Sequence, residues 1–324
     1  MDFKDVEAAA KRLDGVVTRT GLLSSVELDR ITGGQIFIKP ECLQKTGSFK
    51  LRGAYNRLVQ IADEDRHKGV VAFSSGNHAQ GVALAANLLN IPAIILMPND
   101  APKIKIERTR SHGAEVVLFD RVHENREEMG AEIAKAKGAV LVPPYDDQHI
   151  IAGQGTCGLE VMQDMAAKNI NLHSFLAPAS GGGLLAGSAL AVKHFSPKTD
   201  VYSVEPNFFD DHARSLKRGA RVGNDKGAGT SICDALQVEI PGEHTFAVNS
   251  ALVKAGLSVS DDETIEAMRF AFNYLNIVVE PSGAVALAAV LCGKIETENK
   301  NIALVISGGN VDAGYMMSLV NSGV

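Results

Sequence analysis

Short apolar runs alternate with longer segments of helical periodicity along most of the chain. The runs are rich in valine and isoleucine and span residues 70–73, 93–97, 115–118, 140–142, 175–177, 201–204 and 302–306. Between them, apolar residues recur at the spacing of one helix face in segments 81–89, 103–111, 126–137 and 264–275. Because strands alternating with helices are typical of βαβ units, the pattern predicts an α/β fold with mainly parallel sheets.

Three glycine clusters follow directly after predicted strands. They lie at 74–76, 180–183 and 307–309. Ligands of open α/β sheets bind outside the carboxyl ends of the strands, so these clusters are the first place to expect a site.

The middle cluster belongs to the stretch FLAPASGGGLLAG, residues 175–187. A turn of small residues before a helix start presents backbone N–H groups that can hold a phosphate. The stretch also fits a loose dinucleotide pattern at Gly181, Gly183 and Ala186, with Glu205 after the next strand. A phosphate loop, a nicotinamide-dependent oxidoreductase and a purely structural turn all remain open on this motif alone.

Lys50 lies in the segment GSFKLRGA, where Ser48 is the expected N-cap of a helix that continues through Ile61. A cation in the first turn is disfavoured by the helix dipole, and apolar Phe49 and Leu51 add a desolvation cost. Both effects lower the pKa of a lysine. The segment therefore suits a nucleophilic amine, with a solvated surface lysine as the alternative.

Composition narrows the class of protein. The 324 residues allow one large or two moderate domains, and 45% hydrophobic and 22% charged residues are ordinary globular values. A net charge of -6 gives no reason to expect nucleic acid or anionic membrane as a partner. No apolar run approaches the roughly 18 residues of a membrane span, and no signal peptide is evident. Four scattered cysteines form no metal or redox motif, so we expect a cytoplasmic protein.

Six motifs stand in a characteristic order: ECLQKTGSFKLRGA, SSGNHAQG, AGQGT, SGGGLLAG, EPSGA and SGGNVD. In this order the chain resembles the threonine dehydratase and serine racemase family of fold type II pyridoxal phosphate (PLP) enzymes, from about residue 17 to about 312. The resemblance implies that Lys50 carries PLP as a Schiff base. Cys42 stands where the family most often has asparagine, a departure outside the reacting residues.

The same resemblance assigns further contacts. It implies that Asn77 meets the phenolic oxygen of the cofactor and that Ser307 meets its pyridine nitrogen. It places the substrate carboxylate in the 74–78 loop, and the cofactor phosphate in the turn after 175–177. The implied substrate ligands there are Ser74, Ser75, Asn77 and His78, and the implied phosphate ligands are Gly181, Gly182, Gly183 and Leu184.

The activity implied is that of an ammonia-lyase, which converts L-threonine or L-serine to a 2-keto acid and ammonia by β-elimination. Serine racemase or threo-3-hydroxyaspartate ammonia-lyase activity is the alternative. Ser75 resembles a serine that lies opposite the lysine in racemase-like members, although a purely structural serine fits equally well. Arg126 resembles an arginine that approaches a second carboxylate, although a helix-surface residue paired with nearby glutamates fits equally well.

The loop EPNFFDD resembles a divalent-metal site, with Glu205, the Phe209 carbonyl and Asp211 as ligands. Oxygen donors at this spacing suit magnesium, calcium or manganese, and a solvated acidic loop is the alternative. The family architecture implies a large PLP-binding domain made of residues 1–65 and 146–324, and a small domain of residues 66–145. It also implies a homodimer.

Overall fold

The computed structural model describes residues 1–101, 103–225, 227 and 229–321. Two sheets organise the chain, one of five strands in the order β1-β9-β6-β7-β8 and one of four in the order β4-β3-β2-β5. All the described strand pairings are parallel. The strands are β1 (Gln35–Pro40), β2 (Val70–Phe73), β3 (Ala93–Pro98), β4 (Glu115–Phe119), β5 (Val140–Leu141), β6 (Ser174–Pro178), β7 (Asp200–Pro206), β8 (Ala255–Val259) and β9 (Asn301–Ile306).

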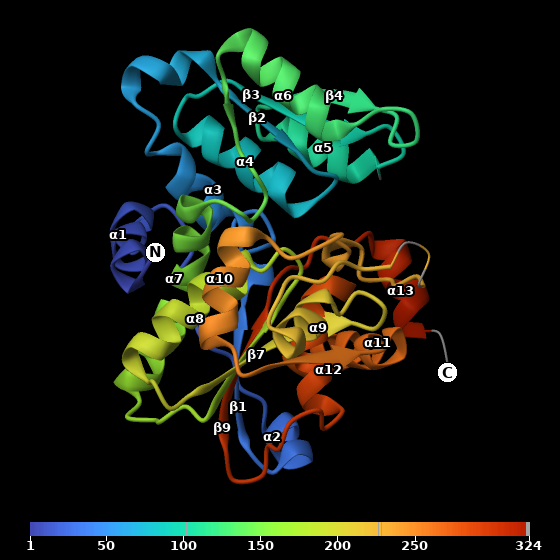
Figure 1. The fold of residues 1–324 in the computed structure, drawn as a ribbon. Helices are drawn as coiled ribbons and strands as arrows, with labels where there is room; N and C mark the ends of the chain where they lie inside the picture. The colour runs from blue at the N-terminus through green and yellow to red at the C-terminus, as the bar shows by residue number, and fades with distance from the viewer. Residues whose placement is uncertain (102, 226, 228, 322–324) are drawn as a thin grey trace.

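Helices cover and connect these sheets, as Figure 1 shows. The four-stranded sheet with α4, α5 and α6 forms one unit, the five-stranded sheet lies in the other, and α3 and α7 pass between them. The helices are α1 (Phe3–Leu13), α2 (Val26–Thr32), η1 (Glu41–Leu43), α3 (Lys50–Leu58), η2 (Asp63–Lys68), α4 (Asn77–Leu88), α5 (Lys103–Ser111), α6 (Arg126–Lys137), α7 (Gln148–Ala167), α8 (Gly183–Phe195), α9 (Asp211–Arg218), η3 (Asp234–Leu236), α10 (Glu243–Leu252), α11 (Asp261–Phe270), η4 (Ala271–Leu275), α12 (Pro281–Leu291) and α13 (Ala313–Asn321).

The predicted α/β class with parallel sheets is confirmed, and each of the seven predicted runs is a strand. β1 and β8 were missed. The segment predicted as a helix over 264–275 begins earlier, at Asp261, because the Ser260 side chain caps it in a capping box. Its last five residues form the π-helix η4.

Separate cores support the two units. β2 and β3 pack with α3 and α4 around residues such as Val82 and Ile95, whereas α12 and β9 share a core around Leu287 and Leu304. All four strands of the smaller sheet fall within residues 70–141. The division at residues 66 and 145 stays a prediction that agrees with this arrangement.

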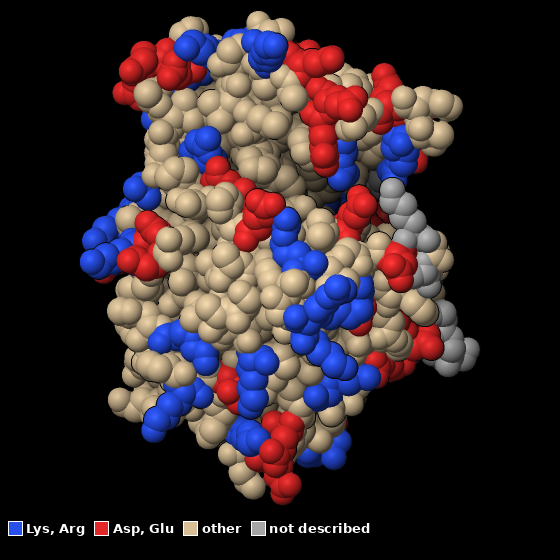
Figure 2. Space-filling model, viewed as in Figure 1, with Lys and Arg blue, Asp and Glu red and all other residues tan. Residues whose placement is uncertain are grey.

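The surface carries charges of both signs. On the face in Figure 2, Lys and Arg are more numerous on the lower half, and acidic side chains lie among them. No helix in the described part of the chain is long and apolar enough to cross a membrane.

Candidate functional site

The segment before Lys50 is tied to the turn after β9. The backbone N–H of Phe49 donates to the carbonyl of Ser307 at 3.1 Å, and the N–H of Gly309 donates to that of Gly47 at 2.9 Å. Ser48 and Gly308 form an isolated antiparallel bridge between these contacts. The first turn of α3 therefore lies beside the carboxyl end of β9.

The predicted N-cap at Ser48 is wrong. α3 begins at Lys50, its N-cap residue is Phe49, and no side chain caps it. Ser48 is held in the bridge to Gly308, which places it before the helix, and its buried hydroxyl has no hydrogen-bond partner among the described residues. The helix also ends at Leu58, short of Ile61.

Lys50 is nevertheless in the first turn, as predicted. Its Nζ donates to the carbonyl of Pro144 at 2.7 Å and lies 5.2 Å from the centre of the Phe49 ring. Desolvation lowers the pKa of Lys50 to about 8, in the predicted direction. Within the described residues no carboxylate forms an ion pair with it. A large fraction of this amine is therefore neutral near pH 8.

Asn77 is the first residue of α4 and contacts two residues from the other unit. Its Nδ2 donates to Glu280 Oε1 at 2.5 Å, and its Oδ1 accepts from Asn310 Nδ2 at 2.7 Å. Burial raises the pKa of Glu280 to about 7, and the charge of Asp234 adds to the shift. Glu280 and Asn310 were not singled out, although both lie in recognised motifs, EPSGA and SGGNVD.

Ser74, Ser75 and Arg126 line one hollow of about 690 Å³. Ser75 is exposed in the chain as described, and the Arg126 guanidinium lies 5.5 Å from the centre of the Phe73 ring. The structure thus brings the predicted carboxylate loop and the predicted second-carboxylate arginine to the same space.

His78 points elsewhere. Its ring is buried, and Nε2 donates to the carbonyl of Val142 at 3.0 Å. Desolvation, reinforced by the charge of Lys50, lowers the pKa of His78 to about 3, so the ring stays neutral. Any contact with a substrate carboxylate would come from the backbone N–H of His78. This group lies in the first turn of α4, where N–H groups have no acceptor within the helix.

The glycine turn packs closely against two rings and has no space for side chains at Gly181 and Gly182. A Cβ on Gly181 would lie 2.1 Å from the Tyr145 ring, and one on Gly182 would lie 2.6 Å from the His212 ring. Gly182 also has a φ of +92°, which favours glycine. α8 begins at Gly183, so its first N–H groups, including that of Leu184, face an open helix end.

The side chains around this turn fit an anionic group. The Ser180 hydroxyl is buried and has no hydrogen-bond partner among the described residues. Together with the positive end of α8, this hydroxyl suits a phosphate. The donor set therefore fits the phosphate of PLP, and Lys50 fits its aldehyde.

Three side chains that were not predicted from the sequence hydrogen-bond to the backbone carbonyls of the glycine turn. Thr245 Oγ1 donates to the carbonyl of Gly181 at 2.5 Å, and Asn249 Nδ2 donates to that of Gly182 at 3.3 Å. His212 Nδ1 donates to the carbonyl of Ser180 at 3.1 Å, and its Nε2 accepts from Asn249 at 2.9 Å. Burial lowers the pKa of His212 to about 4, consistent with this neutral tautomer.

Ser307 directly follows β9. It is 5% exposed, and its hydroxyl has no hydrogen-bond partner in the part of the chain that the structure describes. Its carbonyl accepts from Phe49, next to Lys50. A free hydroxyl here can hydrogen-bond a ring nitrogen without carrying a charge.

A buried acidic cluster lies at the end of β7. Side-chain atoms of Glu205, Asp211 and His212 come within 4.8 Å of one another. Glu205 accepts from the N–H groups of His212 and Ala213, both at 2.8 Å, and thereby caps α9. Desolvation raises the pKa of Glu205 well above its ordinary value and that of Asp211 to about 7.

This cluster suits a cation through Glu205 and Asp211. Asp211 Oδ1 accepts from Asn224 at 2.8 Å, but Oδ2 is buried and has no partner among the described residues. Both ring nitrogens of His212 are already hydrogen-bonded, which leaves the two carboxylates as ligands. The Phe209 carbonyl stays a predicted ligand.

Comparison with known proteins defines the class. The family model described as "Pyridoxal-phosphate dependent enzyme" matches residues 13–308. The chain belongs to this family. The oxidoreductase alternative, which interpreted Gly181, Gly183, Ala186 and Glu205 as a dinucleotide fold, is therefore wrong.

Individual relatives show which members of this family the chain is similar to. The chain is 44% identical to L-threo-3-hydroxyaspartate ammonia-lyase of Pseudomonas sp, covering 98% of both chains, and 40% identical to serine racemase of Schizosaccharomyces pombe, covering 96% and 94%. Among solved structures, a threonine deaminase from T.th. superposes with a TM-score of 0.90 at 42% identity, with 96% of this chain and 99% of that chain covered. These relatives act on small amino acids.

Proposed function

We propose that the protein is a PLP-dependent ammonia-lyase that converts L-threonine or L-serine to a 2-keto acid and ammonia. The observation that carries the proposal is the desolvated amine of Lys50, which donates to the Pro144 carbonyl and has no carboxylate partner among the described residues. The neighbouring Phe49 joins this turn to Ser307. The relatives named as threonine deaminase and hydroxyaspartate ammonia-lyase support the same reaction class.

In the proposed β-elimination, Lys50 moves the proton at the substrate Cα. When bound, PLP withdraws electrons from the substrate Cα and makes its proton acidic. Lys50, once released, takes that proton as a neutral amine. The Cα–H electrons form the Cα–Cβ double bond while the Cβ–O bond breaks, and the hydroxyl leaves as water with one proton. The released enamine takes a proton at Cβ and becomes an imine, which adds water and loses ammonia to give the keto acid.

The other predicted residues bind and orient. Ser74, Ser75 and the N–H groups at the start of α4 would hold the substrate carboxylate. Asn77, fixed between Glu280 and Asn310, would meet the phenolic oxygen of the cofactor. Ser307 would meet the pyridine nitrogen with a neutral hydroxyl, a setting that would favour prompt loss of the β-substituent.

Arg126 bears on the choice of substrate. A bidentate arginine that reaches a second carboxylate is worth about 1.5–3 kcal/mol, or roughly 10- to 100-fold in kcat/KM. If Arg126 does so, kcat/KM for threo-3-hydroxyaspartate falls by this factor in Arg126→Ala, whereas kcat/KM for threonine changes less than about twofold.

One assay tests this function and its alternatives. Purified enzyme is incubated with L-threonine, L-serine, D-serine and threo-3-hydroxyaspartate, and keto acid and enantiomers are measured together. Arg121→Ala is the matched control, because Arg121 lines the same hollow but pairs with Asp100. Keto acid from none of the substrates refutes the lyase. D-serine formed from L-serine favours racemisation, for which Ser75 is the candidate second base.

We further propose that Glu205, Asp211 and the Phe209 carbonyl bind Mg²⁺, or Ca²⁺ or Mn²⁺ in its place. The unpaired buried oxygen of Asp211 supports the proposal. Treatment with EDTA is expected to lower both the melting temperature and turnover, and added Mg²⁺ to restore them. Asp211→Asn should make both quantities insensitive to Mg²⁺, while exposed Asp225→Asn should respond as the wild type does. Unchanged melting and turnover after chelation would refute the site.

We also propose a cytoplasmic homodimer. All four cysteines are free, which suits a reducing compartment. Exposed apolar side chains on η4 and α13, which both contact α11, offer surface for a second copy: Phe272, Tyr274, Tyr315 and Met317. Sedimentation of the purified protein distinguishes a dimer from a monomer.

A further inference from the structure

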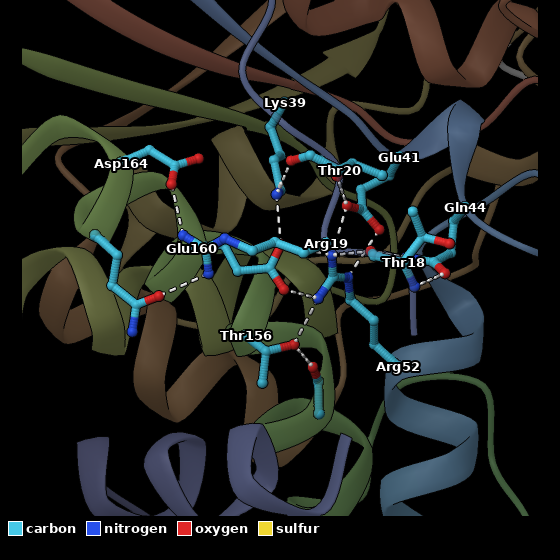
Figure 3. A network of polar contacts seen from close by, with 12 residues as sticks. Thr18, Arg19, Thr20, Lys39, Glu41, Gln44, Arg52, Thr156, Glu160 and Asp164 are labelled. Atoms are coloured by element: carbon cyan, nitrogen blue, oxygen red, sulfur yellow. Dashed lines mark hydrogen bonds and ion pairs between the residues drawn. The ribbon is translucent and has the colours of Figure 1, made fainter. Parts of the chain in front are cut away.

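Four charged side chains form a buried network beside the first turn of α3 (Figure 3). Arg52 comes from α3, Lys39 from β1, Glu41 from η1 and Glu160 from α7. Arg52, Lys39 and Glu41 are fully buried, and Glu160 is 8% exposed. Two cations face two anions, so the network is neutral as a whole.

Arg52 is the centre of this network, and its donors are all engaged. Nε and Nη2 donate to the two carboxylate oxygens of Glu41, each at 2.8 Å. Nη1 and Nη2 donate to those of Glu160 at 2.7 and 2.9 Å, and Nη1 also donates to Thr156 Oγ1 at 3.1 Å. Burial opposes ionisation of Glu41, yet the adjacent guanidinium holds its pKa below the ordinary value. The planar fork thus fixes two carboxylates at once.

The remaining member joins the network to β1. Lys39 Nζ donates to Glu160 Oε2 at 2.5 Å and to the carbonyl of Thr20. The Thr20 hydroxyl in turn donates to Glu41 Oε1 at 2.6 Å. Side chains from β1, η1 and α7 are therefore joined in one network to the first turn of α3.

The same turn is also held by the hydrogen bond from the Phe49 N–H to the Ser307 carbonyl, and by α4, where a Cβ on Gly81 would lie 3.0 Å from the Lys50 carbonyl carbon. α3 has no side-chain N-cap. The network adds the side-chain contacts that a helix cap would otherwise provide. Residues two apart on a helix do not share a face, so Arg52 and Lys50 leave α3 in different directions. On the Arg52 side the backbones nearly touch, since a Cβ on Gly153 of α7 would lie 2.5 Å from the Arg52 carbonyl oxygen.

Stability alone does not require such a network. Burying four charges has a large desolvation cost, and apolar residues of similar volume are often equally stable. Apolar residues cannot form the directional hydrogen bonds of a guanidinium whose donors are all engaged. We propose that Arg52 is a positioning residue for Lys50, because its network holds the first turn of α3 and so keeps Nζ beside Pro144. The inference rests on the proposed role of Lys50.

Arg52→Lys tests the inference because it keeps the charge and removes the fork. In full-length, cofactor-free protein, acetylation of Lys50 is followed against pH by mass spectrometry. The wild-type midpoint should lie at about 8. In Arg52→Lys it should rise by about one pH unit or more, because the displaced amine regains water. In the PLP-loaded enzyme kcat should fall about 100-fold, as expected for a small displacement of a reacting group, with KM within about threefold of wild type.

Arg19→Lys is the matched control. Arg19 also pairs with α7, through Asp164 at 2.5 Å, but its side chain is 50% exposed and forms no hydrogen bond with the four charged side chains of the network among the described residues. This variant should keep the wild-type midpoint and kcat.

A purely structural role predicts a different result. If Arg52→Lys lowers the melting temperature but leaves the Lys50 midpoint and kcat unchanged, the positioning role is refuted. Should Arg52→Lys not fold, Thr156→Val removes one acceptor at nearly constant shape, and an unchanged midpoint in that variant refutes the role equally. Retention of covalently bound PLP in Lys50→Ala would instead overturn the proposed function, whatever Arg52 does.

Discussion

Lys50→Ala should abolish turnover and covalent attachment of PLP. We expect kcat to fall by at least about 10⁴-fold, because the substitution removes the group that takes the Cα proton. The visible absorption of lysine-bound cofactor should vanish, and borohydride should no longer fix PLP to the chain. Absorption spectra and a keto-acid assay measure both effects.

The loss of activity in Lys50→Ala should not be accompanied by a loss of stability. The pKa of Lys50 is about 8 in the folded protein against an ordinary 10.5, so the unfolded chain binds the proton more tightly. The buried ammonium therefore destabilises the cofactor-free protein below about pH 8, and this penalty fades as pH rises toward 10.5. At pH 7 cofactor-free Lys50→Ala should melt no lower than wild type.

Lys45→Ala serves as the control for this prediction. Lys45 is an exposed lysine of the same loop, and its loss should change neither the spectrum nor turnover. A visible band that survives in Lys50→Ala would mean that another amine carries the cofactor.

Much of the fold could be predicted because most strands are continuous apolar runs. Each of the seven predicted runs is a strand, which lies either in the middle of a parallel sheet or at a sheet edge beside one partner strand. β8 was missed because its sequence, AGLSV, lacks such a run and lies at a sheet edge, half-exposed. The π-helix η4 was invisible because apolar spacing does not distinguish it from an α-helix.

The site could be predicted only as far as local sequence reaches. Lys50 and the glycine turn stand in motifs, and the family they indicated is confirmed. The Ser48 prediction failed because its bridge partner, Gly308, lies 260 residues away in the sequence. Arg52 gave no signal of its role for the same reason, since Glu160 comes from a distant helix.

Gly181→Ala should weaken PLP binding by about 100-fold or more. The new methyl group would lie 2.1 Å from the Tyr145 ring, so the turn or the ring must move. A displaced turn would lose at least two charge-assisted hydrogen bonds to the phosphate, each worth about 1.5–3 kcal/mol. Titration of cofactor-free protein with PLP measures the change.

The structure also provides a rescue that identifies the cause. If the clash with Tyr145 displaces the turn, Gly181→Ala combined with Tyr145→Ala should bind PLP more tightly than Gly181→Ala alone, and the two effects should not add. Gly21→Ala, at a position with nothing within 4 Å of a new Cβ, should bind as the wild type does. Wild-type affinity in Gly181→Ala would place the phosphate elsewhere, because a turn that tolerates this methyl group cannot be closely packed around the cofactor.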